Sequence, residues 1–217
     1  MIKAVIFDLD GVLVSTDMMH FMAWKKIAEE ININNFTEED NLRQRGVSRM
    51  ASLDILLEKA DRAYSEQEKE ELARRKNEYY ISLIQDLTPG DVLPGVLTVI
   101  HTLKQNGIAI GIGSASKNTP EILCRTGLDA YIDQVSCGLD ITKSKPDPQV
   151  FLIAAQKLKV NPSDCLVVED SDSGIQAAKA GGMYALAVGS AYNNQQAEFH
   201  AKSLDGFDIQ AVIKQAH

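Results

Sequence analysis

The sequence predicts an α/β protein in which a Rossmann-like parallel-sheet core carries a helical domain inserted after its first strand. Apolar strand-like runs recur at residues 4–9, 108–113, 164–168 and 184–188, and helical patterns separate them. Apolar strands that alternate with helices are typical of a parallel sheet covered on both faces. The second observation is the stretch 16–88, which contains no convincing strand.

The inserted stretch repeats apolar residues at the helical spacing i, i+3, i+4, i+7. The first set is Trp24, Ile27, Ala28 and Ile31, and a second is Met50, Leu53, Leu57 and Ala60. We therefore predict a helical-bundle cap domain over residues 15–92 and a core domain formed by residues 1–14 and 93–217. Pro and Gly occur twice within residues 88–95, which predicts a turn-rich return. The two crossings, near 14–17 and 88–94, would form a hinge on which the cap opens and closes.

Composition limits the classes of partner. The chain has 217 residues, 45% of them hydrophobic, enough for a large core and a smaller companion. Thirty acidic against 22 basic residues give a net charge of −8 without any basic block, so we expect no nucleic-acid partner. No apolar run approaches the ~20 residues of a membrane span, and no signal peptide is evident, so we expect no membrane partner and a cytoplasmic location. The three cysteines predict reduced thiols, and the lack of an association stripe predicts a monomer.

The first strand delivers two carboxylates, Asp8 and Asp10, one residue apart. Residues two apart on a strand share a side, and Gly11 allows a sharp turn directly afterwards. Two carboxylates this close repel each other unless a cation or a shared proton relieves them. This pattern favours a metal-assisted site with one nucleophilic and one acid/base aspartate. The alternative is a strand end that carries two solvated acids.

Three further segments carry polar residues at or near predicted strand ends. Ser114 and the loop that follows it offer hydroxyls and amides to a phosphate, although an ordinary helix cap would also explain them. Lys145 precedes a Pro-rich turn and would neutralise a nucleophilic aspartate and the group it attacks. Glu169 and Asp170 supply the hard oxygens that Mg²⁺ prefers.

The order of these segments, strand–DLDG, strand–SAS, KPDP and strand–ED–x3–GI, resembles the haloacid-dehalogenase-like superfamily over the whole chain. The resemblance implies that Asp8 becomes an aspartyl-phosphate and that Asp10 is the general acid/base. It further implies that Ser114 and Lys145 bind the transferring phosphoryl group. Mg²⁺ would then be held by Asp8, the backbone carbonyl of Asp10, Glu169 and Asp170.

The predicted cap contains a compact candidate anion site in the segment RGVSR at residues 45–49, with Ser52 one helical turn further on. Arg49 is suited to a bidentate hold on phosphate, and Ser48 suits a helix N-terminus aimed at the same anion. A second phosphate site fits a substrate phosphorylated at both ends, which a mutase requires. A capped helix with surface arginines is the alternative.

Several stretches resemble the sugar phosphomutases of this superfamily in particular: FDLDGV, T-D-x-x-H-F-x-A-W-K, G-V-S-R-x-x-S, A-R-R-K-N and S-A-S-K-N. The resemblance implies interconversion of β-glucose 1-phosphate and glucose 6-phosphate through β-glucose 1,6-bisphosphate, and places Thr16 in the hinge near Asp10. The implied substrate-binding residues are His20, Trp24, Gly46, Val47, Ser48, Arg49, Ser52, Lys76, Ala115, Ser116, Lys117 and Asn118. Arg45 stands where the resemblance leads us to expect lysine.

Three alternatives remain open. A phosphatase with the same core would hydrolyse a small sugar phosphate and release free phosphate. A catalytically silent sugar-phosphate-binding protein would not need the intact set of Asp8, Asp10, Lys145, Glu169 and Asp170. A dinucleotide-binding Rossmann domain would need a third glycine after Gly111 and Gly113 at the fingerprint spacing, and the sequence lacks one.

Overall fold

A computed structural model describes residues 1–215, whose centre is a six-stranded parallel sheet with strand order β3-β2-β1-β4-β5-β6. The strands are β1 (Ala4–Phe7), β2 (Ala109–Gly113), β3 (Gln134–Ser136), β4 (Cys165–Glu169), β5 (Tyr184–Val188) and β6 (Phe199–Ala201). The predicted α/β class and the four predicted strands are confirmed. The edge strands β3 and β6 were not predicted, because three residues are too few to form a recognisable apolar run.

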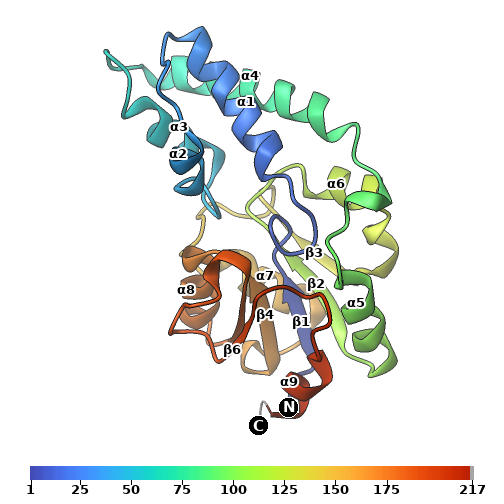
Figure 1. Cartoon of the computed structure of the whole chain (residues 1–217). Coiled ribbons are helices and arrows are strands. Elements are labelled where there is room, and N and C mark those ends of the chain that lie inside the picture. The colour runs from blue at the N-terminus through green and yellow to red at the C-terminus, as the bar shows by residue number, and fades with distance from the viewer. Residues whose placement is uncertain (216–217) are drawn as a thin grey trace.

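Helices cover both faces of the sheet (Figure 1). They are α5 (Val96–Gln105), α6 (Thr119–Thr126), α7 (Gln149–Leu158), α8 (Asp172–Ala180) and α9 (Ile209–Gln215), with short 3-10 turns at Pro89–Asp91, Leu128–Tyr131, Pro162–Asp164 and Gly189–Ala191. Val5 and Phe7 of β1 belong to the apolar cluster that includes α5, α6 and α9. Ala4 and Ile6 belong to the cluster with α7 and α8. Successive residues of β1 therefore pack alternately against the helices on the two faces of the sheet.

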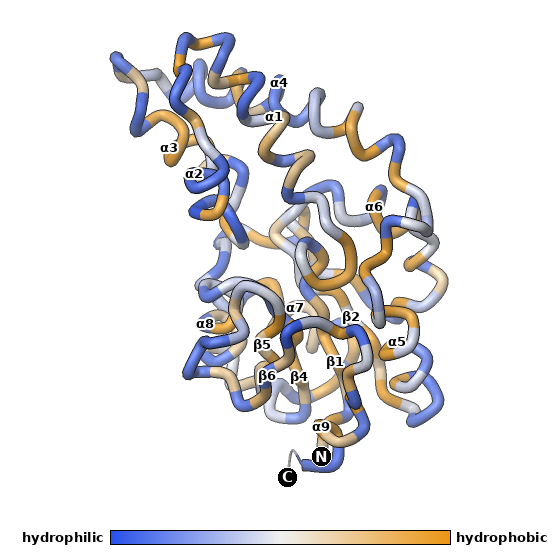
Figure 2. Tube along the Cα trace, in the orientation of Figure 1, coloured by the Kyte–Doolittle hydropathy of each residue, from blue (hydrophilic) through white to orange (hydrophobic). Residues whose placement is uncertain are grey.

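The segment between β1 and α5 forms the predicted helical insert. Its helices are α1 (Asp17–Glu30), α2 (Glu38–Leu42), α3 (Arg49–Leu57) and α4 (Glu66–Ile84). They enclose an apolar core of their own around Trp24, Ile27, Leu53 and Leu56. Figure 1 shows this group beyond the sheet, with α1 and α4 side by side, and Figure 2 shows apolar residues concentrated on the strands of the core. Within residues 1–215, no helix combines the length and apolar character needed to cross a membrane.

The chain passes between the insert and the core at two neighbouring points. Val14 forms an isolated antiparallel bridge with Val92, and the Leu93 amide donates to the Leu13 carbonyl at 2.9 Å. Two segments that lie far apart in the sequence are therefore paired where they cross. This pairing is consistent with the predicted hinge. The motion of the cap and the exact domain boundaries stay predictions.

The first strand ends two residues earlier than predicted. Pairing stops at Phe7, and Asp8 continues the line by donating its amide to the Val168 carbonyl at 2.9 Å. Asp10 lies in the turn that follows, so the two aspartates are placed by a loop as well as by the strand. Gly11 makes that turn with a φ of +77°, in the left-handed region that favours glycine.

Candidate active site

A cavity of about 500 Å³ lies between the insert and the carboxyl ends of the central strands. The predicted residues that line it are Asp8, Asp10, His20, Trp24, Gly46, Val47, Ser48, Arg49, Ser52, Lys76, Ser114, Ala115, Ser116, Lys117, Asn118, Glu169 and Asp170. Thr16 and Lys145 are buried behind this lining and reach it through hydrogen bonds to aspartates. The fold therefore brings the predicted core and cap residues to one place.

Three carboxylates meet at the ends of β1 and β4. Oxygen atoms of Asp8, Glu169 and Asp170 all lie within 4.8 Å of one another. The turn after β1 leaves no room for a side chain here, since a Cβ at Gly11 would lie 2.2 Å from Asp170 Oδ2. A compact set of buried hard oxygens is the donor set that Mg²⁺ takes in phosphoryl-transfer sites. The Asp10 side chain lies outside this group.

Lys145 is the buried cation that partly balances these acids. Its Nζ donates to Asp8 Oδ1 at 2.6 Å and to Glu169 Oε1 at 2.7 Å, and its side chain is 0% exposed. Burial lowers the pKa of Lys145, but the neighbouring charges of Asp8 and Glu169 outweigh it, so the net direction is upward. Burial nevertheless raises the pKa of Asp8 to about 7, despite the lysine. Burial, followed by the charges of Glu169 and Asp8, raises the pKa of Asp170 to about 8. The cluster is short of positive charge, which fits a divalent cation.

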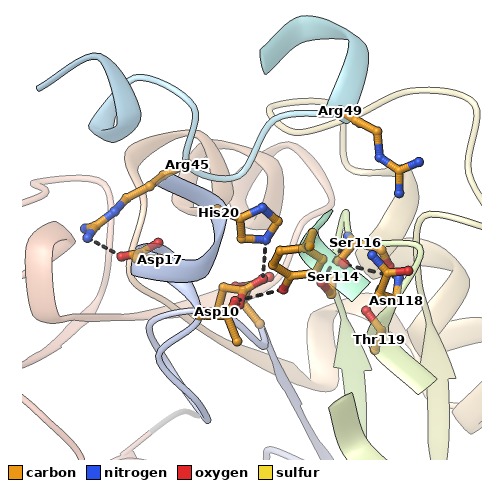
Figure 3. A network of polar contacts seen from close by, with 12 residues as sticks. Asp10, Asp17, His20, Arg45, Arg49, Ser114, Ser116, Asn118 and Thr119 are labelled. Carbon is orange, nitrogen blue, oxygen red and sulfur yellow. Dashed lines mark hydrogen bonds and ion pairs between the residues drawn. The ribbon is translucent and has the colours of Figure 1, made fainter. Parts of the chain in front are cut away.

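Asp10 occupies a different environment from Asp8. Thr16 donates its hydroxyl to Asp10 Oδ1, and the Tyr80 hydroxyl donates to Thr16 Oγ1 at 3.1 Å. His20 Nε2 lies 3.9 Å from Asp10 Oδ2 (Figure 3). Burial raises the pKa of Asp10 to about 6, against the hydrogen bond from Thr16, which lowers it. A carboxyl group that titrates near neutral pH can both hold and release a proton, as acid/base catalysis requires.

The insert supplies a second set of polar groups above Asp10. Lys76 Nζ lies 2.7 Å from His20 Nδ1 and 5.0 Å from the centre of the Trp24 ring. Burial and the nearby charge of Arg49 lower the pKa of Lys76 well below its ordinary value. The pKa of His20 is also well below its ordinary value, first because of burial and then because of the nearby charges of Lys76 and Arg49. Trp24 is only 1% exposed, so it is part of the cap core as well as a wall of the cavity.

Groups from insert and core also face each other at the far end of the cavity. Arg49, at the start of α3, donates from Nη2 to Asn77 Oδ1 at 2.7 Å, and Asn118 donates from Nδ2 to the same oxygen at 2.9 Å. Figure 3 shows Arg49 reaching down from the insert towards Asn118 on the loop after β2. Ser116 Oγ in turn accepts a hydrogen bond from the backbone N–H of Asn118 at 3.2 Å. Asn77 was not predicted as a site residue, although it directly follows Lys76 in the A-R-R-K-N stretch.

Ser48 and Ser114 have structural partners as well as places in the cavity wall. Ser48 caps α3 by accepting the Ala51 amide at 3.2 Å, so the helix-cap alternative holds for this side chain. Ser114 is buried at the end of β2, and its Oγ accepts the amide of Ser116 at 3.2 Å. A serine that accepts a hydrogen bond still has its own O–H to donate.

Arg45 joins the insert to the core. Its guanidinium pairs with Asp17 and donates to Ser190 Oγ at 2.8 Å, and Nη1 lies 3.7 Å from Asp170 Oδ2. No local pattern indicates these contacts, because Ser190 lies 145 residues from Arg45. Gly46 beside it approaches the core so closely that a Cβ would lie 2.6 Å from Ser173 Oγ.

The parallel sheet, the inserted helices, the buried Asp8–Lys145 pair and the acidic cluster together define the haloacid dehalogenase class of phosphoryl-transfer fold. The family model for haloacid dehalogenase-like hydrolases matches residues 2–182, and the chain belongs to this family.

Among individual relatives, the chain is similar to the β-phosphoglucomutase of Bacillus subtilis, with 47% identity over 86% of this chain and 83% of that protein. It is also similar to a crystal structure of β-phosphoglucomutase from Clostridium difficile, with a TM-score of 0.94, 37% identity, and coverage of 100% of this chain and 97% of that one. A phosphorylated carbohydrates phosphatase of Thermotoga maritima is 32% identical over 83% of this chain and 82% of its own length. The similarity to β-phosphoglucomutases supports an enzyme that moves a phosphoryl group within its substrate.

Proposed function

We propose that this chain is a Mg²⁺-dependent sugar phosphomutase that interconverts β-glucose 1-phosphate and glucose 6-phosphate through an aspartyl-phosphate and β-glucose 1,6-bisphosphate. One observation carries the proposal: the cavity has a nucleophile with its cation at one end, Asp8 and Lys145, and a second cationic group, Arg49, at the other. A substrate with a phosphate at each end fits such a cavity. A substrate with one phosphate needs only the first end.

The chemistry at the core end follows from the contacts of Asp8 and Asp10. A carboxylate oxygen of Asp8 forms a bond to phosphorus as the bond from phosphorus to the sugar oxygen breaks, and Asp10 donates a proton to that leaving oxygen. Lys145 and the Ser114 hydroxyl stabilise the charge on the phosphoryl oxygens. Mg²⁺, held by Asp8, Asp170 and the Asp10 carbonyl with Glu169 beside them, would neutralise the repulsion between carboxylate and phosphate.

The return step transfers the phosphoryl group from Asp8 to a sugar hydroxyl. Asp10 then accepts the proton of that hydroxyl, so the acid of one half-reaction is the base of the other. The bisphosphate must turn around between the two half-reactions, so that each phosphate is held in turn near Asp8 and near Arg49. His20 and Lys76 lie between the two ends and would contact the sugar. A mutase requires a sugar rather than water as the acceptor, and Arg45 and Gly46 of the insert contact the core beside the cavity.

A phosphatase is the second candidate, because similar proteins include the Thermotoga maritima phosphatase and a fructose-1-phosphate phosphatase of Escherichia coli, which is 34% identical over 84% of this chain and 94% of that protein. In a phosphatase the same aspartyl-phosphate would be transferred to water.

The aspartyl-phosphate is tested by incubating the protein with Mg²⁺ and β-glucose 1,6-bisphosphate and measuring its intact mass and peptide map. The wild type should gain one phosphoryl group on the peptide that contains Asp8, and Asp8→Asn should gain none. Asp61→Asn, at an exposed position in the insert, is the matched control and should behave like the wild type. A phosphoryl group on any other peptide, or one retained by Asp8→Asn, contradicts the assignment of the nucleophile.

A further inference from the structure

Asn77 lies at a junction between the insert and the core. It belongs to α4, and one atom, its side-chain oxygen, accepts from two directions: Arg49 Nη2 at 2.7 Å and Asn118 Nδ2 at 2.9 Å. The two donors come from different parts of the fold, since Arg49 begins α3 of the insert and Asn118 precedes α6 of the core. They are 28 and 41 residues from Asn77 in the sequence.

The identity of the shared atom follows from chemistry. A guanidinium can only donate hydrogen bonds, so the Asn77 atom that faces Arg49 must be the amide oxygen. The Asn118 atom that faces the same oxygen must then be its NH₂ group. This arrangement uses one of five guanidinium N–H donors and one of two amide N–H donors. Among residues 1–215 the other N–H groups of the Arg49 and Asn118 side chains have no hydrogen-bond acceptor, so they can donate to a ligand, and all three residues line the cavity.

We propose that Asn77 is a positioning residue that ties Arg49 to Asn118 across the boundary between cap and core, so that both halves of the distal phosphate site are aligned with each other when the cap is closed. The proposal rests on the proposed function in one respect, that Arg49 and Asn118 bind the distal phosphate. It predicts that loss of the shared oxygen weakens both phosphate binding and the closure that accompanies it, because each donor then has to be ordered separately.

Two substitutions separate the two effects. Asn77→Ala removes the acceptor. Asn77→Asp keeps two acceptor oxygens and so keeps the bridge, but it places a negative charge where a phosphate must approach. Gln67→Ala is the matched control, because Gln67 is an exposed residue on the same helix and lies outside the cavity.

Small-angle X-ray scattering of the protein saturated with inorganic phosphate measures closure, and calorimetric titration with inorganic phosphate measures the affinity of the distal site. The titration is made without divalent cation, since the three carboxylates at the core end then repel phosphate. We expect Asn77→Ala to give a more extended particle and to bind phosphate about five- to thirtyfold more weakly, the effect of one or two hydrogen bonds. Asn77→Asp should scatter like the wild type and still bind phosphate weakly. Gln67→Ala should match the wild type in both measurements.

A double-mutant cycle with Arg49→Ala tests whether Asn77 acts through Arg49. Asn77→Ala should have a smaller effect on phosphate binding in that background, because only the alignment of Asn118 is then lost. The proposal is overturned if phosphate-saturated Asn77→Ala is as compact as the wild type, or if its phosphate affinity is unchanged or tighter while Arg49→Ala loses affinity. A full additional loss in the Arg49→Ala background also overturns it. Should Arg49→Ala bind phosphate like the wild type, the distal site of the proposed function fails instead, and the scattering comparison decides the bridge by itself.

Discussion

Lys145 should contribute more to stability than any exposed ion pair of the chain. Its side chain is 0% exposed, and it is held at 2.6 Å from Asp8 and 2.7 Å from Glu169. Lys145→Met keeps the apolar stem but leaves two buried carboxylates without their cation, for which a loss of roughly 3–5 kcal/mol of unfolding free energy is expected. Lys3→Met is the matched control: the Lys3–Asp164 pair has the same short distance, 2.7 Å, but the lysine is 62% exposed. That change should leave the free energy of unfolding nearly unchanged, because solvent screens an exposed pair.

The loss in Lys145→Met should depend on pH. The lysine lowers the pKa of Asp8, so its removal raises that pKa further above the value in the unfolded chain. A carboxyl group with a raised folded-state pKa stabilises the fold below its unfolded pKa and loses that contribution as the pH rises through the folded value. Urea denaturation with a chelator at about pH 5 and about pH 8 should therefore show the larger loss at the higher pH. A loss no greater than that of Lys3→Met, or one independent of pH, refutes the reasoning.

Three further outcomes follow from the same site. Metal-free protein should lose stability as the pH rises through about 6, because burial raises the pKa of Asp10 from 3.8 to about 6. The ionisation of Asp10 should lower the free energy of unfolding by roughly 3 kcal/mol, and Asp10→Asn should remove this part of the pH dependence. Lys76→Met should raise the urea midpoint, since it removes a buried amino group whose charged form is disfavoured by burial. It should also abolish phosphoglucomutase activity, and an unchanged turnover rate would exclude a role for Lys76 in the reaction. Gly11→Ala should destabilise the fold by roughly 2 kcal/mol or more and weaken Mg²⁺ binding in a metal titration, because its Cβ would lie 2.2 Å from Asp170. Gly107→Ala, also at positive φ but with nothing within 4 Å, should cost less and leave Mg²⁺ binding intact.

The fold could be predicted because its signals are local. Buried central strands such as β1 and β4 are apolar throughout, and the insert repeats apolar residues at helical spacing. The edge strands β3 and β6 have no such signal: their three residues are defined by pairing with β2 and β5. Pairing is a property of the assembled sheet.

The candidate site was predictable to the extent that its residues lie in short motifs at strand ends. Asp8, Glu169 and Asp170 converge because parallel strands bring their carboxyl ends to one edge. The contacts of Asn77 and Arg45 were not predictable, since they join segments that only the closed arrangement of cap and core brings together. Their polarity is ordinary for a helix surface, and no spacing rule distinguishes them from solvated residues.

The central claim is that the phosphoryl group returns to the sugar rather than passing to water. It is tested most directly by supplying β-glucose 1-phosphate and Mg²⁺, with and without trace β-glucose 1,6-bisphosphate, and measuring glucose 6-phosphate and free phosphate in the same reaction. The account predicts glucose 6-phosphate, formed faster with the bisphosphate, with little free phosphate and with no product from Asp8→Asn. Free phosphate that accumulates without glucose 6-phosphate would contradict it and would assign this site to a phosphatase.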